Sequence, residues 1–282
     1  MKRIKLYATI GLTTLLLTSC AKQVTETRTV YPIDVTRPSL TPYELNVISE
    51  RIYQNETGGN LKYLMYWSPN EDFASLGIGH FIWYPQGEPK RFDETFPSMI
   101  DYYVANKVEV PQWLLQARKT GAPWKNREVF ERSRGDKEFQ QLQTLLINTK
   151  ALQTQFFFDR LHASIPEIVK YVAPQYRKHI VNNYNALAKT KGGWYPLIDY
   201  INFKGKGIKA TERYNNQGWG MLQVLKDMRP VQAGAGALAE FSRVAYLTLE
   251  RRVKNSPAEK NERKWLAGWK KRTDSYRTSI FQ

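Results

Sequence analysis

An acid at the end of a predicted helix is the strongest candidate for chemistry in this sequence. Ile48 and Ile52 recur at helical spacing, and a further step of four residues places Glu56 on the same apolar stripe. Gly58 and Gly59 follow and supply a left-handed cap that ends the helix. The helix dipole and the apolar surroundings both disfavour a charged carboxylate there, and an acid that keeps its proton can protonate a leaving oxygen. Alternatively, Glu56 caps the glycine turn or pairs with a lysine.

Two further acids, Glu71 and Asp72, lie in a segment whose composition predicts a turn. This turn separates a short aromatic run, 61–67, from an apolar run, 73–84. We predict that the two runs form a small β-hairpin or ribbon that folds the acids back toward Glu56. A second carboxylate near the first would position water or stabilise positive charge on a sugar, although acids in a turn also serve turn geometry and solvation alone.

The rest of the chain must hold these acids in place, and its pattern is mainly helical. Residues 41–44, Thr-Pro-Tyr-Glu, have the form of a capping box with proline at the first helical position. The predicted fold class is therefore mainly α (α+β), with one domain over residues 41–282 and a small β element. Further helices are predicted at 97–107, 111–119, 126–133, 136–149, 151–163, 166–173, 176–190, 195–202, 217–228, 235–254 and 259–277.

The N-terminus has the pattern of a secretory signal over residues 1–19. Basic residues flank an apolar run that is too short for a stable membrane span. The run ends in Leu-Thr-Ser-Cys20, which resembles the lipobox of bacterial lipoproteins, whose cysteine is lipidated; the alternative is an incidental thiol in an uncleaved segment. We expect residues 20–40 to be a lipidated tether and Cys20 to hold the protein on a membrane. Ala21, rather than aspartate, follows the cysteine, which favours the outer membrane, facing the periplasm, in a two-membrane envelope.

The net charge narrows the class of partner. The whole chain carries +16, and loss of the three basic residues in 1–19 leaves +13. A secreted, tethered protein would rarely meet nucleic acid, so the charge favours anionic polymers or lipid headgroups, or it serves solubility alone. Cys20 is the only cysteine, so no intrachain disulfide can form. We expect no nucleic-acid partner and a monomer.

Several aromatic residues could stack against sugar rings or fill the core. Tyr66 lies in the predicted ribbon, and Trp194 and Trp219 adjoin glycine-rich turns. His80 is interpreted as a hydrogen-bonded structural residue of the ribbon rather than a base. With three histidines and one cysteine in the chain, we find no ligand set for a metal and expect no cofactor.

The run Glu56-Thr-Gly-Gly, followed by Ser75-Leu-Gly-Ile-Gly-His80, resembles the active-site region of the lysozyme-like superfamily, particularly phage-type lysozymes. The resemblance covers residues 44–84 and implies a lysozyme-like helical domain whose catalytic glutamate ends a helix beside a β-ribbon. It also extends to chitosanases and lytic transglycosylases, which differ in the second acid. The segment 217–225, which begins at Gln217, is loosely similar to a glutamine-containing cleft segment of transglycosylase-like domains.

The resemblance implies roles for particular positions. Glu56 would be the general acid, and Ser75 stands where phage-type enzymes place a threonine that helps to position water. Gly77 and Gly79 fall on the ribbon motif that forms the floor of the cleft. Two departures are evident: the spacing from Glu56 to Ser75 is longer than in the phage-type pattern, and either of two neighbouring acids could be the second carboxylate.

The functional prediction is cell-wall glycan cleavage by a lipid-anchored envelope protein, as a peptidoglycan hydrolase or lytic transglycosylase. A strongly basic protein would be repelled by cationic chitosan and attracted to a cell wall, or a related anionic glycan, that carries free carboxylates. The alternative is a non-catalytic peptidoglycan-binding or envelope-scaffold lipoprotein with the same fold, because fold does not determine function. An inhibitor or assembly factor for another envelope enzyme is a third possibility.

Overall fold

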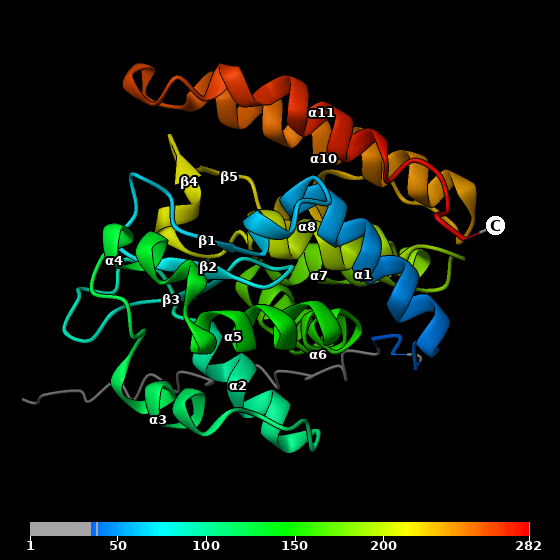
Figure 1. Cartoon of the computed structure of the whole chain (residues 1–282). Coiled ribbons are helices and arrows are strands. Elements are labelled where there is room, and N and C mark those ends of the chain that lie inside the picture. The colour runs from blue at the N-terminus through cyan, green and yellow to red at the C-terminus, as the bar shows by residue number, and fades with distance from the viewer. Residues whose placement is uncertain (1–34, 38, 282) are drawn as a thin grey trace, which may run out of the picture. The chain divides into compact units, whose positions relative to one another are not determined.

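The computed structural model describes residues 35–37 and 39–281, and its elements form a mainly helical fold with a small antiparallel sheet (Figure 1). This confirms the predicted fold class. The predicted signal, Cys20 and most of the predicted tether lie outside the described residues. Within the described ranges, no helix is long and apolar enough to cross a membrane.

The first helix, α1 (Pro42–Thr57), has the predicted beginning and end. The Thr41 side chain accepts a hydrogen bond from the Glu44 amide, and the Glu44 carboxylate accepts one from the Thr41 amide, which completes the capping box. Gly58 has φ +62° and donates its amide to the Gln54 carbonyl, so the helix ends in the left-handed cap that the glycine pair predicts.

The predicted ribbon contains three strands rather than two. A short 3-10 helix, η1 (Leu61–Leu64), leads into β1 (Met65–Tyr66), β2 (Ala74–Leu76) and β3 (Phe81–Trp83), which pair antiparallel in that order. The apolar run 73–84 is not one strand, because the chain reverses within it at Gly77 (φ +71°) and His80 (φ +47°). Both residues adopt left-handed backbone conformations, which end β2 and start β3.

The remaining helices follow the predicted pattern closely, with three corrections. Residues 151–173 do not form two helices, because α6 (Lys150–Tyr171) continues through Pro166, and buried apolar residues on both sides of the proline hold it together. Residues 217–220 are not helical, since β5 (Gln217–Gly218) pairs with β4 (Arg213–Tyr214). The last predicted helix is divided into two short 3-10 segments and α11 (Leu266–Asp274).

The other elements complete the order along the chain. They are α2 (Phe96–Ala105), α3 (Gln112–Thr120), α4 (Arg127–Arg132), η2 (Ser133–Gly135), α5 (Lys137–Asn148), α7 (Pro174–Ala188), α8 (Trp194–Lys204), η3 (Ala210–Glu212), α9 (Met221–Asp227), α10 (Ala235–Asn255), η4 (Ala258–Lys260) and η5 (Glu262–Trp265).

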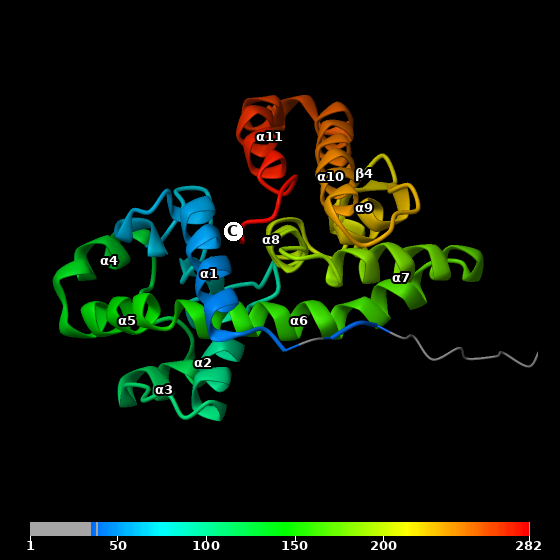
Figure 2. The same cartoon turned by 90° about the vertical axis from the view of Figure 1, so that its right-hand side faces the viewer.

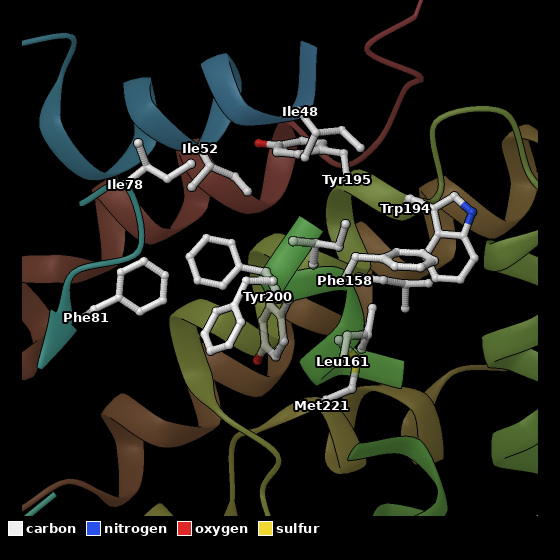
Figure 3. Packing of buried hydrophobic residues seen from close by; sticks show 14 of the residues in the cluster. Ile48, Ile52, Ile78, Phe81, Phe158, Leu161, Trp194, Tyr195, Tyr200 and Met221 are labelled. Carbon is white, nitrogen blue, oxygen red and sulfur yellow. The ribbon is translucent and has the colours of Figure 1, made fainter. Parts of the chain in front are cut away.

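The core is built around α6, against which α1, α2, α7 and α8 pack. In Figure 2, α8 lies below α11 and to the right of α1, while α6 runs beneath α1 and α8. The buried side chains of these elements form one continuous cluster, in which Ile52 of α1 lies near Ile78 of the ribbon turn (Figure 3). The packing therefore brings the end of α1, the ribbon and the C-terminal helix together.

Candidate active site

Glu56 lies where three segments from distant parts of the sequence meet. Its Oε1 accepts a hydrogen bond from Nη2 of Arg272 in α11 at 2.6 Å, and its Oε2 lies 3.4 Å from Nδ1 of His80 in the ribbon turn. The side chain is 14% exposed. The apolar stripe thus places Glu56 inward as predicted, but the carboxylate meets a guanidinium there instead of apolar surroundings.

Arg272 is itself held by a second, fully buried acid. Asp199 of α8 has no exposed side-chain surface, and its two oxygens accept hydrogen bonds from Nε and Nη2 of Arg272 at 2.8 Å each. Burial opposes the charge on Arg272, but Asp199 and Glu56 outweigh it and raise its pKa. The bidentate pair fixes the plane of the guanidinium, and this plane in turn fixes Oε1 of Glu56.

Further hydrogen bonds surround this ion pair. Asn55, the residue before Glu56, donates its amide to Oδ1 of Asp199 at 3.2 Å and to the Tyr195 hydroxyl at 2.9 Å. Tyr276 donates its hydroxyl to Asp199, and burial followed by the charge of Asp199 raises the pKa of Tyr276. The hydroxyl of Tyr276 therefore remains a donor to Asp199 across the physiological range, and α1, α8 and the C-terminus of the chain share one polar network.

The glycines of the ribbon turn are packed against α6. A Cβ on Gly77 would lie 2.3 Å from Oε1 of Gln153, and one on Gly79 would lie 1.9 Å from Cζ of Phe157. Gln153 is fully buried and accepts a hydrogen bond from the Ile78 amide at 2.9 Å. The structure thus accounts for Gly77 and Gly79 by close packing that positions His80, rather than by direct contact with a substrate.

Glu71 and Asp72 face a different cation from the one that faces Glu56. Arg91 lies 2.7 Å from Asp72 and 3.5 Å from Glu71. Partial burial raises the pKa of Glu71, with Asp72 adding to the effect and Arg91 opposing it. Both candidates for the second acid are therefore paired with Arg91 in this structure.

Ser75 and Tyr66 share one face of the three-stranded sheet. The register places Ser75 opposite Tyr66 on β1 and Ile82 on β3, and all three are half-buried. Tyr66 also makes an edge contact with the exposed ring of Tyr63, at 5.6 Å between centroids. This face is partly exposed, whereas the side chains of the opposite face are buried in the core.

The two predicted sugar-stacking tryptophans are both buried. Trp194 packs edge-on against Phe158 in the core, as Figure 3 shows. Trp219 lies between the ring of Tyr214, at 4.6 Å, and the guanidinium of Arg252, at 4.1 Å. Neighbouring side chains therefore cover both rings in this structure, within the core cluster for Trp194 and outside it for Trp219. Gln217 is exposed on β5.

Neither a cluster of metal-binding side chains nor either of two surface hollows lies at Glu56 in the part of the chain that the structure describes. No group of three or more His, Cys, Asp or Glu side chains that could hold a metal ion occurs there. One hollow is lined by α2 and α3 residues that include Val104 and Arg118, and another by residues near the end of α10 that include Lys254 and Glu262. Neither hollow includes Glu56.

Comparison with protein-family models, with curated proteins and with solved structures returned no match.

The residues that sequence reasoning missed are Asp199 and Arg272. A lone acid within the apolar segment Trp-Tyr-Pro-Leu-Ile-Asp199-Tyr-Ile-Asn-Phe is a signal that could have been used, because a charge in such a run requires a buried partner. Arg272 follows two other basic residues and is not distinguished from them by pattern. Its role depends on a contact with an acid 216 positions earlier in the chain.

Proposed function

We propose that this protein cleaves a cell-wall glycan of the peptidoglycan type, that Glu56 is the general acid, and that Cys20 anchors the chain by lipid in the bacterial envelope. The observation that supports the proposal best is the asymmetric setting of the Glu56 carboxyl. Oε1 is fixed by Arg272, whereas Oε2 lies 3.4 Å from Nδ1 of His80. An acid with one oxygen oriented and the other free for proton transfer is suited to protonating a glycosidic oxygen.

The reaction places separate demands on the surrounding residues. Glu56 must receive a proton on Oε2, and we assign this transfer to His80, whose Nδ1 lies 3.4 Å away, in place of the purely structural role expected from the sequence. Water on the other face of the sugar would be activated by Glu71 or Asp72 once substrate separates them from Arg91. The Asp199–Arg272 pair holds Oε1 in place throughout, so it orients the acid without meeting the substrate.

A second candidate is a non-catalytic glycan-binding or scaffold protein of the envelope. Two observations favour it: the Glu56 carboxylate is ion-paired in the free protein, and both candidate second acids are paired with Arg91. On this view the polar network stabilises the fold, and the partly exposed sheet face that bears Tyr66 and Ser75 contacts the glycan.

Release of dye from labelled peptidoglycan sacculi tests the first proposal. We expect the wild-type protein to release dye and Glu56→Gln to lose release by at least about 100-fold, because the neutral amide cannot donate the proton. The matched control is Glu50→Gln, which changes an exposed acid on the same helix that pairs with Lys150 and should leave release unchanged. Circular dichroism checks that both variants retain the fold. Equal release by Glu56→Gln would refute the acid assignment, and binding of sacculi without release by any variant would favour the second candidate.

A further inference from the structure

A buried lysine lies beside the Glu56 network without an ion-pair partner. Lys204 ends α8, only five residues after Asp199, and the residue is 9% exposed. Within the ranges that the structure describes, no hydrogen bond or ion pair joins its Nζ to any residue. Nζ instead lies between two rings, 3.7 Å from the centroid of Phe203 and 3.8 Å from that of Trp269.

The acids around Lys204 are paired with two arginines. Arg252 of α10 is paired with both oxygens of Glu262 at 2.7 Å, and Arg272 is paired with Asp199 and Glu56. Asp199, Glu56 and Glu262 are therefore each bound to an arginine. Lys204 is the remaining basic residue of the cluster, with aromatic rings on two sides of Nζ and no hydrogen bond to an oxygen of any residue that the structure describes.

The rings of Phe203 and Trp269 connect Lys204 to the Glu56 site. The Arg272 guanidinium lies 3.9 Å from the Phe203 centroid, on the ring that also contacts Nζ, and the Arg252 guanidinium lies 5.3 Å from the Trp269 centroid. A ligand that reaches Nζ therefore lies next to the residue that orients Glu56. Because Lys204 is nine-tenths buried, the ligand group must be small and must displace water from the amine.

We propose that Lys204, held between Phe203 and Trp269, is the binding site for a carboxylate group carried by the glycan. A carboxylate would supply the hydrogen-bond acceptor that no described residue offers to Nζ. This inference rests on the proposed function for the identity of the ligand, since peptidoglycan carries free carboxylates on its stem peptides and on lactyl groups from which the peptide has been removed. It assigns to Lys204 the recognition of anionic substrate, separate from the proton transfer by Glu56.

The ionisation of Lys204 supports this assignment. Burial lowers the pKa of Lys204 well below its usual range, and Arg252 and Arg272 lower it further, while Glu262 and Glu56 oppose the shift. A bound carboxylate would stabilise the ammonium and raise this pKa. Binding should therefore be linked to proton uptake at Lys204 and should weaken as the pH rises through the pKa of the lysine.

Binding of a defined small carboxylate gives the first test. We would titrate N-acetylmuramic acid, which carries a lactyl carboxylate, into the purified protein labelled with ¹³C at the lysine ε-carbon, and N-acetylglucosamine, which lacks the carboxylate, into a second sample. The lysine signal that disappears from the spectrum of Lys204→Met is the signal of Lys204. We expect N-acetylmuramic acid to raise the titration midpoint of Lys204 and N-acetylglucosamine to leave it unchanged. An unchanged midpoint with both sugars, or an equal shift with both, would overturn the inference.

Binding to whole sacculi gives the second test, in protein that also carries Glu56→Gln so that cleavage does not interfere. Lys204→Met should bind native sacculi about tenfold more weakly than its parent, the loss expected for one charge-assisted hydrogen bond. On sacculi whose carboxylates have been amidated, the variant and its parent should bind equally. Lys204→Arg keeps the charge and should retain part of the preference. Lys206→Met is the control, since that lysine is paired with Glu167. Equal binding of native sacculi by Lys204→Met and its parent would overturn the proposed carboxylate site. The role of Glu56 in cleavage is tested separately, by the dye-release assay. Displacement by inorganic phosphate as readily as by N-acetylmuramic acid would contradict the preference for a carboxylate.

Discussion

Replacing Arg272 by methionine should destabilise the protein strongly, because the arginine compensates a fully buried charge. Asp199 has no exposed side-chain surface, and two of its hydrogen bonds come from Arg272. Removing one partner of a buried pair leaves the other charge unpaired, at a cost of about 3–5 kcal/mol in the free energy of unfolding. At about 2–4 °C per kcal/mol for a domain of this size, the melting temperature should fall by roughly 6–20 °C.

Urea and thermal denaturation followed by circular dichroism measure this loss. The control is Lys271→Met, which changes the exposed neighbour on the same helix and should stay within about 0.5 kcal/mol of the wild type. The double variant that combines Arg272→Met with Asp199→Asn should lose less than the sum of the single losses, because it removes the unpaired charge together with its partner. A loss below about 1 kcal/mol for Arg272→Met, or strict additivity in the double variant, would refute the view that this ion pair holds the network together.

Two further predictions concern other parts of the fold. Hydrogen bonds from Arg243 and Arg229 outweigh burial and lower the pKa of Glu240 from its ordinary 4.5 to about 2. The contribution of Glu240 to stability is therefore present above pH 4.5 and is lost as the pH falls toward 2. Because Arg229 and Arg243 are 75% and 44% exposed, Glu240→Gln should lower the free energy of unfolding by only about 1–2 kcal/mol at pH 7. Denaturation of wild type and variant should show a smaller difference at pH 2.5 than at pH 7. An equal difference at the two pH values would contradict the assignment. Gly79→Ala should destabilise the protein by about 1–3 kcal/mol, because the new methyl group would meet Phe157. Gly236→Ala, in a helix with open space around it, should stabilise the protein by about 0.5–1 kcal/mol. Equal melting temperatures for the two variants would contradict the packing argument.

Local patterns in the sequence were sufficient to predict the first helix. Thr41 and Glu44 cap its start, and Gly58 ends it in a left-handed conformation, as the residue types require. The inward placement of Glu56 followed from the helical spacing for the same reason. These predictions succeeded because each depends on residues within one or two helical turns of each other.

Features that depend on tertiary packing were not predictable in the same way. Pro166 reads as a helix boundary, but burial of its neighbours on α6 outweighs the missing hydrogen bond. The alternation around Gly77 and Gly79 reads as one strand, and the reversal there depends on the buried side chain of Gln153, 75 positions away from Ile78. Local spacing contains no information about such contacts.

The same limitation applies to the candidate site. Asp199 and Arg272 are 73 positions apart, and Arg272 belongs to a run of basic residues that a sequence reading assigns to solvent. Trp194 and Trp219 adjoin glycine-rich turns, but such turns also occur where a chain returns into the core, and both tryptophans are buried. Burial decides between a core tryptophan and a sugar-stacking one, and burial follows from the packing of the whole domain.

Mass spectrometry of the fragments released from purified sacculi tests the central claim most directly. The wild-type protein should release disaccharide-peptide fragments, with reducing ends from a hydrolase or 1,6-anhydro ends from a lytic transglycosylase, and Glu56→Gln should release none while Glu50→Gln releases the wild-type set. Identical fragments from wild type and Glu56→Gln, or no fragments from the folded wild-type protein at any pH or salt concentration, would contradict the claim that Glu56 cleaves the glycan.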